Sequence, residues 1–239
     1  MNSLYRHIIL TLLLLTTTSL FAQPRILAEI HSGIETKWHL YDVVWVCTGD
    51  TLSIDFTPEK EQIWQIDGFW ISCTELTRDQ WFWYLTLDPE PISDPLLPIT
   101  NITRSQADSF CIKMNTLINS HWRLPTRDEW LFAFKGGLFS EGYRFSGSNN
   151  AEWVAWTRNN SGGKLHIGGL RIANELGIYD MSGNAAEMVT NGDETLCVGG
   201  CCLDDEDRWT NDNSEFTGFR IVMPEPLWFN EQGERVFHR

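Results

Sequence analysis

The run WRLPTRDEWLFAFKGG, residues 122–137, carries the clearest local pattern in the chain. Thr126 stands three residues before Glu129, so the hydroxyl of one and the carboxylate of the other can satisfy free backbone N–H groups at a helix start. The Gly136–Gly137 pair that follows is a common end for a helix. The run therefore predicts a short, capped helix that stops in a tight turn.

The same capping pattern occurs twice upstream. Thr77 stands three residues before Gln80, and Thr103 stands three residues before Gln106, so two further helices are expected to begin there. The helix after Thr103 carries apolar residues at spacings that form one face: Ala107, Phe110, Cys111, Met114, Leu117 and Ile118. Cys111 lies on that face, which indicates a core thiol rather than a reactive one.

Strands are expected on both sides of the helices. Residues 38–46, 51–57, 63–72 and 218–223 have the composition or alternation of strands. Residues 138–217, in contrast, are rich in Gly, Asn, Ser and Asp and show little regular pattern. A stretch this long without regular structure indicates a functional surface, or loops held by metal ions or disulfides. No repeat, linker or shift in composition divides the chain, which predicts one domain.

Composition and charge narrow the class of partner. The chain has 239 residues, 42% of them hydrophobic, 12 tryptophans and a formal net charge of −14. Such a chain can bury a sizeable core that takes up most of the tryptophans. The acidity argues against nucleic acid and anionic membrane surfaces as partners, because both would repel it.

The N-terminus has the pattern of a secretory signal peptide. Arg6 precedes the apolar run Ile8–Leu15, and Ala22 offers a small residue for cleavage. The run is too short to favour a membrane span. We therefore expect a signal peptide at 1–22, a single domain at 23–223 and a tail at 224–239. The mature protein would be exported to the periplasm, the cell surface or the medium, with no span left after cleavage.

In an exported protein the six cysteines could form disulfides, because disulfides persist outside the cytoplasm. They permit fifteen pairings, and the sequence does not choose among them. The six are Cys47, Cys73, Cys111, Cys197, Cys201 and Cys202.

Several motifs together carry a family resemblance. Residues 122–137, then NELGIYDMSGNAAEM at 174–188, then a Gly-Gly pair at 199 followed by GFR ending at Arg220, resemble the formylglycine-generating enzyme, or sulfatase-modifying factor, family. The resemblance covers about 62–222. It implies an α+β fold, a variant of the C-type-lectin fold with little regular structure, small antiparallel sheets, a few helices and long loops. Residues 122–125 would then be structural.

The resemblance also implies a calcium site. Asp180 and Glu187 flank the tight turn SGN, and Ca²⁺ prefers carboxylates combined with backbone carbonyls. The family's site would use both side chains together with the carbonyls of Gly183 and Ala185. In a purely structural alternative, Asp180 caps a turn and Glu187 is solvated. The chain also departs from the family here, since Ala186 and Met188 replace the aromatic residues usual beside the glutamate.

Catalytic members of the family oxidise a sulfatase cysteine to formylglycine with one copper(I) ion held between two cysteines after the Gly-Gly pair. Asp204 and Trp209 stand near those two positions, so the copper pair does not map. Cys201 and Cys202 follow Gly200 directly, and in an extended strand their side chains would point to opposite faces. A structural disulfide or buried thiols are favoured. A relocated Cu⁺ site at Cys197, Cys201 or Cys202 remains the alternative.

These observations favour a non-catalytic exported domain that binds a protein or glycan partner at the cell envelope or is part of a cell-surface assembly. The loops at 143–165 and 201–217 would form the surface, with Trp153, Trp156 and Trp209 as anchors. His166 is interpreted as a packed turn residue rather than a metal ligand. Two alternatives stay open: a divergent copper-dependent formylglycine-generating oxidase, and a calcium-dependent carbohydrate-binding protein.

Overall fold

The structure is a computed structural model that describes residues 68–86, 93–118, 120–206 and 214–224. It also describes the backbone of six short strands outside these ranges: β1 (Arg25–Ile26), β2 (Asp42–Val46), β3 (Leu52–Thr57), β4 (Lys60–Trp64), β10 (Trp228–Phe229) and β11 (Arg235–Val236). The expected signal peptide, Cys47 and Trp209 lie outside the described residues.

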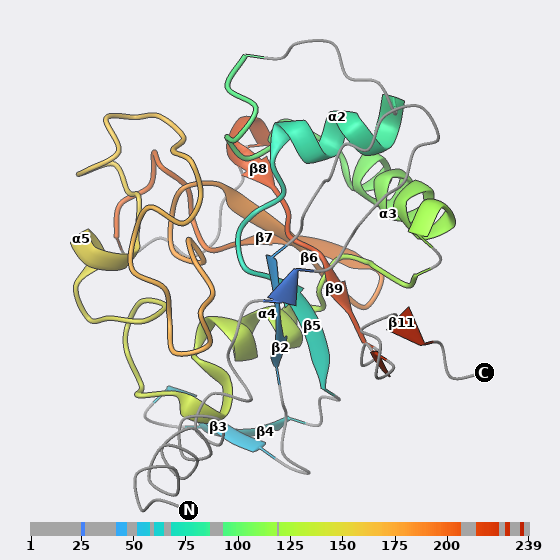
Figure 1. The fold of residues 1–239 in the computed structure, drawn as a ribbon. Coiled ribbons are helices and arrows are strands. Elements are labelled where there is room, and N and C mark those ends of the chain that lie inside the picture. Colours follow the sequence, from blue (N-terminus) through green and yellow to red (C-terminus); the bar gives the residue numbers. More distant parts are fainter. Residues whose placement is uncertain are drawn as a thin grey trace, which may run out of the picture.

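An antiparallel sheet in the order β1-β2-β5-β9 joins the start of the domain to its end (Figure 1). Its inner strands are β2 and β5 (Phe69–Ser72), and β9 (Val222–Met223) forms an edge. All four residues of β5 are buried, because strand neighbours flank it and helices and loops cover it. The sequence predicted one strand over 63–72. The structure instead ends β4 at Trp64 and begins β5 at Phe69.

A second sheet has the order β7-β6-β8 and consists of β6 (Ala186–Asn191), β7 (Glu194–Val198) and β8 (Thr217–Gly218). β6 and β7 form an antiparallel hairpin, whereas β8 runs parallel to β6. Gly192 adopts a positive φ of 60° in the hairpin turn, a conformation that glycine takes without strain. This sheet differs from the expectation of little regular structure over 138–217.

Three helices begin where the capping boxes predict: α2 (Arg78–Thr86), α3 (Arg104–Ile118) and α4 (Arg127–Phe134). At α4 the Thr126 hydroxyl accepts from Glu129 N, and the Glu129 carboxylate accepts from Thr126 N. The reciprocal bonds form at the other two helices as well. The remaining helical segments are short: α5 (Ala151–Val154), η1 (Gly137–Phe139) and η2 (Ser214–Phe216).

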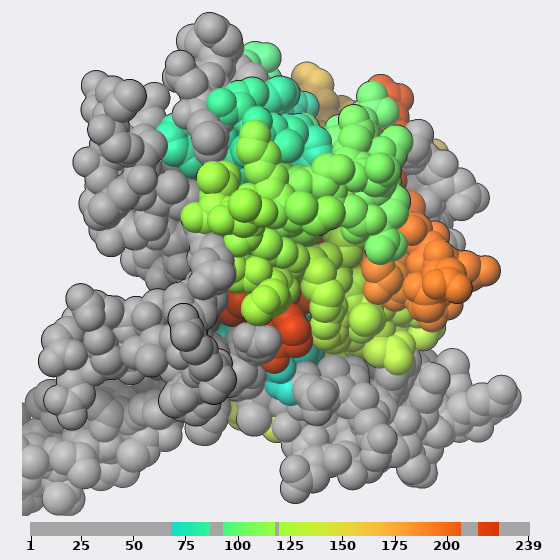
Figure 2. Space-filling model, turned by 90° about the vertical axis from the view of Figure 1, so that its right-hand side faces the viewer, coloured from blue at the N-terminus to red at the C-terminus, as the bar shows by residue number. Residues whose placement is uncertain are grey.

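Helices α2 and α3 pack together and cover one face of the domain beside the β6–β7 hairpin (Figure 2). Phe110 of α3 stacks on Trp81 of α2, with ring centroids 5.3 Å apart. Cys111 is buried here and its pKa rises to about 12 because burial disfavours the thiolate, which confirms the core thiol. The apolar face ends earlier than predicted, since Leu117 is 40% exposed.

The α+β class, the small sheets and the long loops agree with the fold expected from the sequence. Among the described residues, no helix is both long enough and apolar enough to cross a membrane.

Candidate functional site

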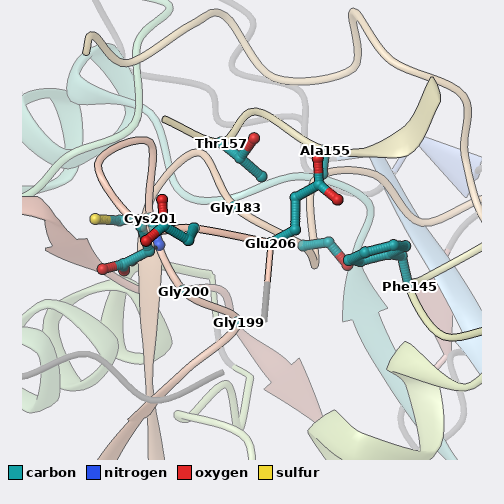
Figure 3. Close-up of a pocket in the computed structure, with 11 residues that line it drawn as sticks. Phe145, Ala155, Thr157, Gly183, Gly199, Gly200, Cys201 and Glu206 are labelled. Carbon is teal, nitrogen blue, oxygen red and sulfur yellow. Dashed lines mark hydrogen bonds between the residues drawn. The ribbon is translucent and has the colours of Figure 1, made fainter. Parts of the chain in front are cut away.

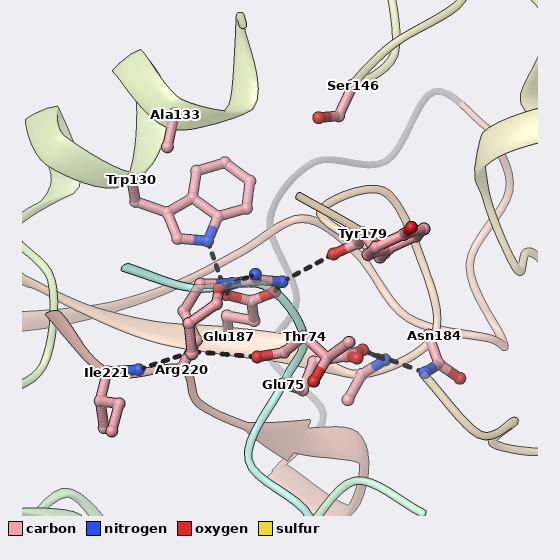
Figure 4. Close-up of polar contacts among 12 residues, drawn as sticks. Thr74, Glu75, Trp130, Ala133, Ser146, Tyr179, Asn184, Glu187, Arg220 and Ile221 are labelled. Carbon is pink, nitrogen blue, oxygen red and sulfur yellow. Dashed lines mark hydrogen bonds and ion pairs between the residues drawn. The ribbon is translucent and has the colours of Figure 1, made fainter. Parts of the chain in front are cut away.

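The centre of the domain is a buried ion pair between Arg220 and Glu187 (Figure 4). Arg220 Nε donates to Glu187 Oε2 at 2.6 Å, and Nη2 donates to Glu187 Oε1 at 2.7 Å. Trp130 Nε1 adds a third hydrogen bond to Oε2 at 2.7 Å. Both charged side chains are almost fully enclosed, so the pair is isolated from water on every side.

Arg220 also connects separate parts of the chain. Its Nη1 donates to the carbonyl of Ser72 at 2.9 Å, and its Nη2 donates to the carbonyl of Tyr179 at 3.0 Å. Burial disfavours the charged guanidinium, but the Glu187 carboxylate outweighs this and holds the pKa of Arg220 above its ordinary value. A planar, five-donor group suits such a junction better than any other side chain.

Two further buried carboxyl groups, Glu75 and Asp180, lie around the same guanidinium. Glu75 Oε1 accepts from Asn184 Nδ2 and from Ala185 N, whereas its Oε2 has no hydrogen-bond partner in the described part of the chain. Asp180 Oδ2 accepts from Gly169 N at 2.6 Å, and its Oδ1 has no partner. Glu75 was not among the residues expected at a site from the sequence. The available signal was an acid two residues after the largely apolar run FWISC at 69–73.

Burial is the main cause that raises the pKa of both carboxyl groups. The pKa of Glu75 lies well above its usual value of 4.5, through burial and then through the nearby charges of Asp180 and Glu187. Burial raises the pKa of Asp180 to about 6, although the Gly169 N–H opposes the shift. One guanidinium therefore stands among three acids, and at least Glu75 is stabilised in its neutral form.

Glu75→Gln is expected to gain stability relative to the wild type as the pH rises from about 5 to about 8. The raised pKa means that the folded state holds its Glu75 proton at a pH where the unfolded chain has lost it. The contribution of this group to folding therefore falls as the pH rises through that window. Glutamine has no such proton to lose. Urea unfolding of both proteins across the window measures the difference, with exposed Glu152→Gln as the control. A difference that stays constant with pH contradicts this assignment.

The turn Ser182–Asn184 draws four segments together next to this centre. Asn184 N donates to the carbonyl of Trp156, and Asn184 Oδ1 accepts from His166 N. Gly183 N donates to the carbonyl of Gly199 at 2.8 Å. Gly183 and Asn184 both have positive φ, at 77° and 57°. The turn Ser182–Asn184 therefore joins the loops that contain Trp156, His166 and Gly199.

Cys201 and Cys202 lie in a turn, not in the extended strand expected from the sequence. Asp204 N donates to the carbonyl of Cys201 at 2.9 Å, and Asp204 Oδ2 accepts from Cys201 N at 2.8 Å. Gly199 and Gly200 precede the turn with φ values of 88° and 68°, so the chain bends before it reaches the cysteines. The expectation that the two side chains point to opposite faces rested on the geometry of an extended strand, which these residues do not have.

The five described cysteines are thiols in the structure, so the expected disulfides are not seen among them. Cys201 and Cys202 are buried, and Cys197 is partly buried on β7, where it packs against the α2–α3 core.

Trp153 is the main apolar feature of the loop surface. It is 58% exposed on α5 and borders a hollow of about 450 Å³. Three of the residues that line this hollow have apolar or amphipathic side chains: Tyr143, Trp153 and Ile172. Three others have short polar side chains: Ser148, Asn149 and Asn150. Ile172 N donates to the carbonyl of Trp153 at 2.9 Å, which fixes the short helix against the next loop.

Trp156 is not the exposed anchor that the sequence suggested. Its ring is half-buried and stacks on His166, with centroids 3.7 Å apart. The guanidinium of Arg171 lies 3.7 Å from the same ring. His166 Nε2 also contacts the carbonyl of Ser161 at 2.9 Å, which confirms His166 as a packed turn residue. Of the two predicted anchors that the structure describes, Trp153 and Trp156, only Trp153 is exposed.

Residues 34–223 match the family model of the sulfatase-modifying factor enzyme 1-like domain. The chain belongs to this family. The match begins upstream of the 62–222 range expected from the motifs. The Glu187–Arg220 pair joins two of the motifs that carried the resemblance, NAAEM and GFR.

The chain is also similar to known proteins in sequence and in structure. Chaperone protein LppX of Paenibacillus barcinonensis is 30% identical over 172 residues, a match to 51% of this chain and 61% of that protein. The match thus spans less than two thirds of that relative. Treponema denticola variable protein 1 has the same fold, with a TM-score of 0.64 and 18% identity over 82% of this chain and 99% of its own. CarF has a TM-score of 0.62 and 23% identity over 78% of this chain and 99% of its own.

The calcium ligands that the family resemblance implies are only partly suited to an ion in this arrangement. Glu187 already accepts three hydrogen bonds, two of them from a guanidinium, so its oxygens face a positive charge. Asp180 Oδ1 lacks a partner and suits a cation better. Among the described residues, no three His, Cys, Asp or Glu side chains are grouped to hold a metal ion. Calcium binding through Asp180, Gly183, Ala185 and Glu187 stays a prediction.

This geometry predicts a small response to calcium. Saturating Ca²⁺ or an excess of chelator is expected to change Tm by less than about 2 °C, because Arg220 already neutralises Glu187. Differential scanning fluorimetry with and without chelator measures the shift. A calcium-dependent rise of several degrees contradicts the expectation and assigns the ion a structural role.

The family's copper position is also altered. Asp204 stands where the first copper thiolate is expected, and its carboxylate is buried and bonded to Cys201 N. A carboxylate does not replace a soft thiolate for copper(I).

Proposed function

We propose that this protein is a non-catalytic, exported member of the family that binds a polypeptide partner at the cell envelope. The exposed Trp153 beside its hollow carries the proposal. The leader pattern at 1–22 supports export, and Asp204 at the first copper position supports the loss of oxidase chemistry.

The hollow has the chemistry of a side-chain receptor. Aromatic and aliphatic surface from Tyr143, Trp153 and Ile172 lies beside the polar groups of Asn149 and Asn150. Recognition pockets combine apolar walls with a few polar groups in this way. Exposed tryptophan is also among the residues that dominate binding energy in protein interfaces.

The hollow is held in shape before a partner arrives. Asn150 Oδ1 accepts from Glu152 N and caps α5, and Asn149 Oδ1 accepts from Arg144 N. Arg171 Nη1 donates to the carbonyl of Glu152 at 2.6 Å. A surface fixed in this way loses little conformational entropy on binding, which favours affinity.

Local charge indicates what the partner carries. Residues 141–175 contain four basic residues (Arg144, Arg158, Lys164 and Arg171) and three acidic residues (Glu141, Glu152 and Glu175), a net charge of +1 within a chain of −14. Complementary potentials steer association and select partners. The proposed ligand is therefore an extended segment with an apolar side chain flanked by acidic residues. The chaperone name of one relative supports a polypeptide as the partner.

Trp153→Ala is expected to weaken binding of an acid-flanked apolar peptide by at least about thirtyfold, because an exposed interface tryptophan typically contributes about 2 kcal/mol or more. Fluorescence anisotropy with labelled peptides measures the affinity. The panel holds one apolar core with acidic, neutral or basic flanks, and the acidic peptide is expected to bind tightest.

Ile112→Ala is the matched control, since Ile112 is 67% exposed on α3, outside the residues that line the hollow. It should bind as the wild type does. Equal losses in both variants, or a preference for oligosaccharides over every peptide, contradict the proposal. So does aldehyde formation when copper-loaded protein is incubated with a peptide containing Cys-x-Pro-x-Arg.

A further inference from the structure

The Cys201–Cys202 pair is held in a defined arrangement that neither the family motifs nor the proposed binding role uses. Cys202 N donates to the carbonyl of Asn184 at 2.9 Å, and the Ser161 hydroxyl donates to the carbonyl of Cys202 at 2.7 Å. Together with the Asp204 bonds described above, these contacts fix the backbone on both sides of the pair. The two thiols are therefore buried neighbours on one ordered turn.

The thiols also interact with each other and differ in character. A hydrogen bond with the Cys202 side chain lowers the pKa of Cys201, and Leu203 N donates to Cys201 Sγ at 3.5 Å. The same contact with Cys201, followed by burial, raises the pKa of Cys202. Cys201 is thus the better thiolate, and Cys202 retains a proton.

Access to the pair is restricted to small molecules. Cys201 is among the residues that line a cavity of about 10 Å³, but its sulfur points away from the other lining residues (Figure 3). Both side chains are otherwise enclosed, so bulky disulfide reagents are excluded from the folded protein. Hydrogen peroxide, which is nearly as small as water, is the class of oxidant that suits two thiols buried to this extent.

We propose that Cys201 and Cys202 form a peroxide-reactive dithiol that closes to a disulfide between neighbouring residues. The Cys201 thiolate attacks one oxygen of hydrogen peroxide, the O–O bond breaks, and hydroxide leaves and takes up a proton as water. The resulting sulfenic acid is then attacked by the Cys202 sulfur, which releases a second water. In total, two thiols lose two electrons, and one peroxide becomes two waters.

The product should be readily reversible. Consecutive Cα atoms are about 3.8 Å apart, closer than the usual separation in disulfides, so the bond stores strain and is easily reduced. A strained disulfide has a more oxidising potential than a structural one. The proposal is independent of the partner that the Trp153 hollow binds.

The test uses the full chain with Cys197→Ser, so that the peptide spanning residues 201–202 contains no third cysteine. The protein is reduced, treated with stoichiometric hydrogen peroxide, and then denatured and alkylated for mass spectrometry. We expect both thiols to become protected from alkylation together, to reappear after mild reduction, and Cys111 to remain alkylatable as the internal reference.

Single variants separate the two roles. With Cys202→Ser, Cys201 should stop at a sulfenic acid that dimedone traps. With Cys201→Ser, the dimedone adduct at Cys202 should fall by at least about tenfold, since burial still disfavours the thiolate at that position. Protection of neither thiol, equal adducts in the two variants, or reaction that appears only after denaturation would overturn the proposal.

Discussion

Arg220→Met is expected to lower the free energy of unfolding by about 3–5 kcal/mol, because it leaves a buried charge without its partner. Methionine fills a similar volume but cannot donate to Glu187, Ser72 or Tyr179. The carboxylate of Glu187 would then face Glu75 and Asp180 with no neutralising group between them. Urea unfolding followed by tryptophan fluorescence measures the loss.

Arg104→Met provides the comparison, since Arg104 forms an exposed pair with Asp108 at 2.8 Å on α3. Exposed pairs contribute about 0–1 kcal/mol, so this variant should remain close to the wild type. If Arg220→Met costs less than about 1 kcal/mol, the buried pair is not the structural centre described above.

Gly183→Ala is expected to cost about 3–4 kcal/mol through two separate effects. Its φ of 77° disfavours any residue with a Cβ. An added Cβ would also lie 2.2 Å from the carbonyl oxygen of Trp156, which is backbone and cannot move aside cheaply. Relief of this contact would break the Asn184–Trp156 hydrogen bond and separate the loops that meet at the turn.

Gly162→Ala isolates the second effect. Gly162 has a similar φ of 66°, and nothing lies within 4 Å of an added Cβ. This control should cost only the conformational penalty, about 1–2 kcal/mol. Thermal or urea unfolding of both variants gives the difference. Equal losses at the two positions would show that the close approach to Trp156 carries no energetic weight.

Local sequence rules predicted the helices well, because the decisive interactions lie within four residues. Thr77, Thr103 and Thr126 each begin a helix with the expected reciprocal bonds. The hairpin β6–β7 could also have been predicted from Gly192–Asp193, a two-residue turn signal that was passed over among many polar residues. Its strands lie in a region whose composition favoured irregular structure.

The buried polar centre could not be found in this way. Glu75 and Arg220 are brought to the same centre from positions 145 residues apart, and no local pattern links them. The Cys201–Cys202 turn was missed for a related reason, since its shape depends on Asp204, Ser161 and Asn184. Trp153 and Trp156 look alike in sequence, yet only contacts with His166 and Arg171 make one of them a packing residue.

Amide hydrogen exchange with and without the acid-flanked apolar peptide tests the proposed recognition surface most directly. The account predicts slower exchange in residues 143–154 and 170–172, lost with Trp153→Ala, and no change in α3. Protection confined to other segments, or tight binding that leaves both of these stretches unchanged, would contradict it.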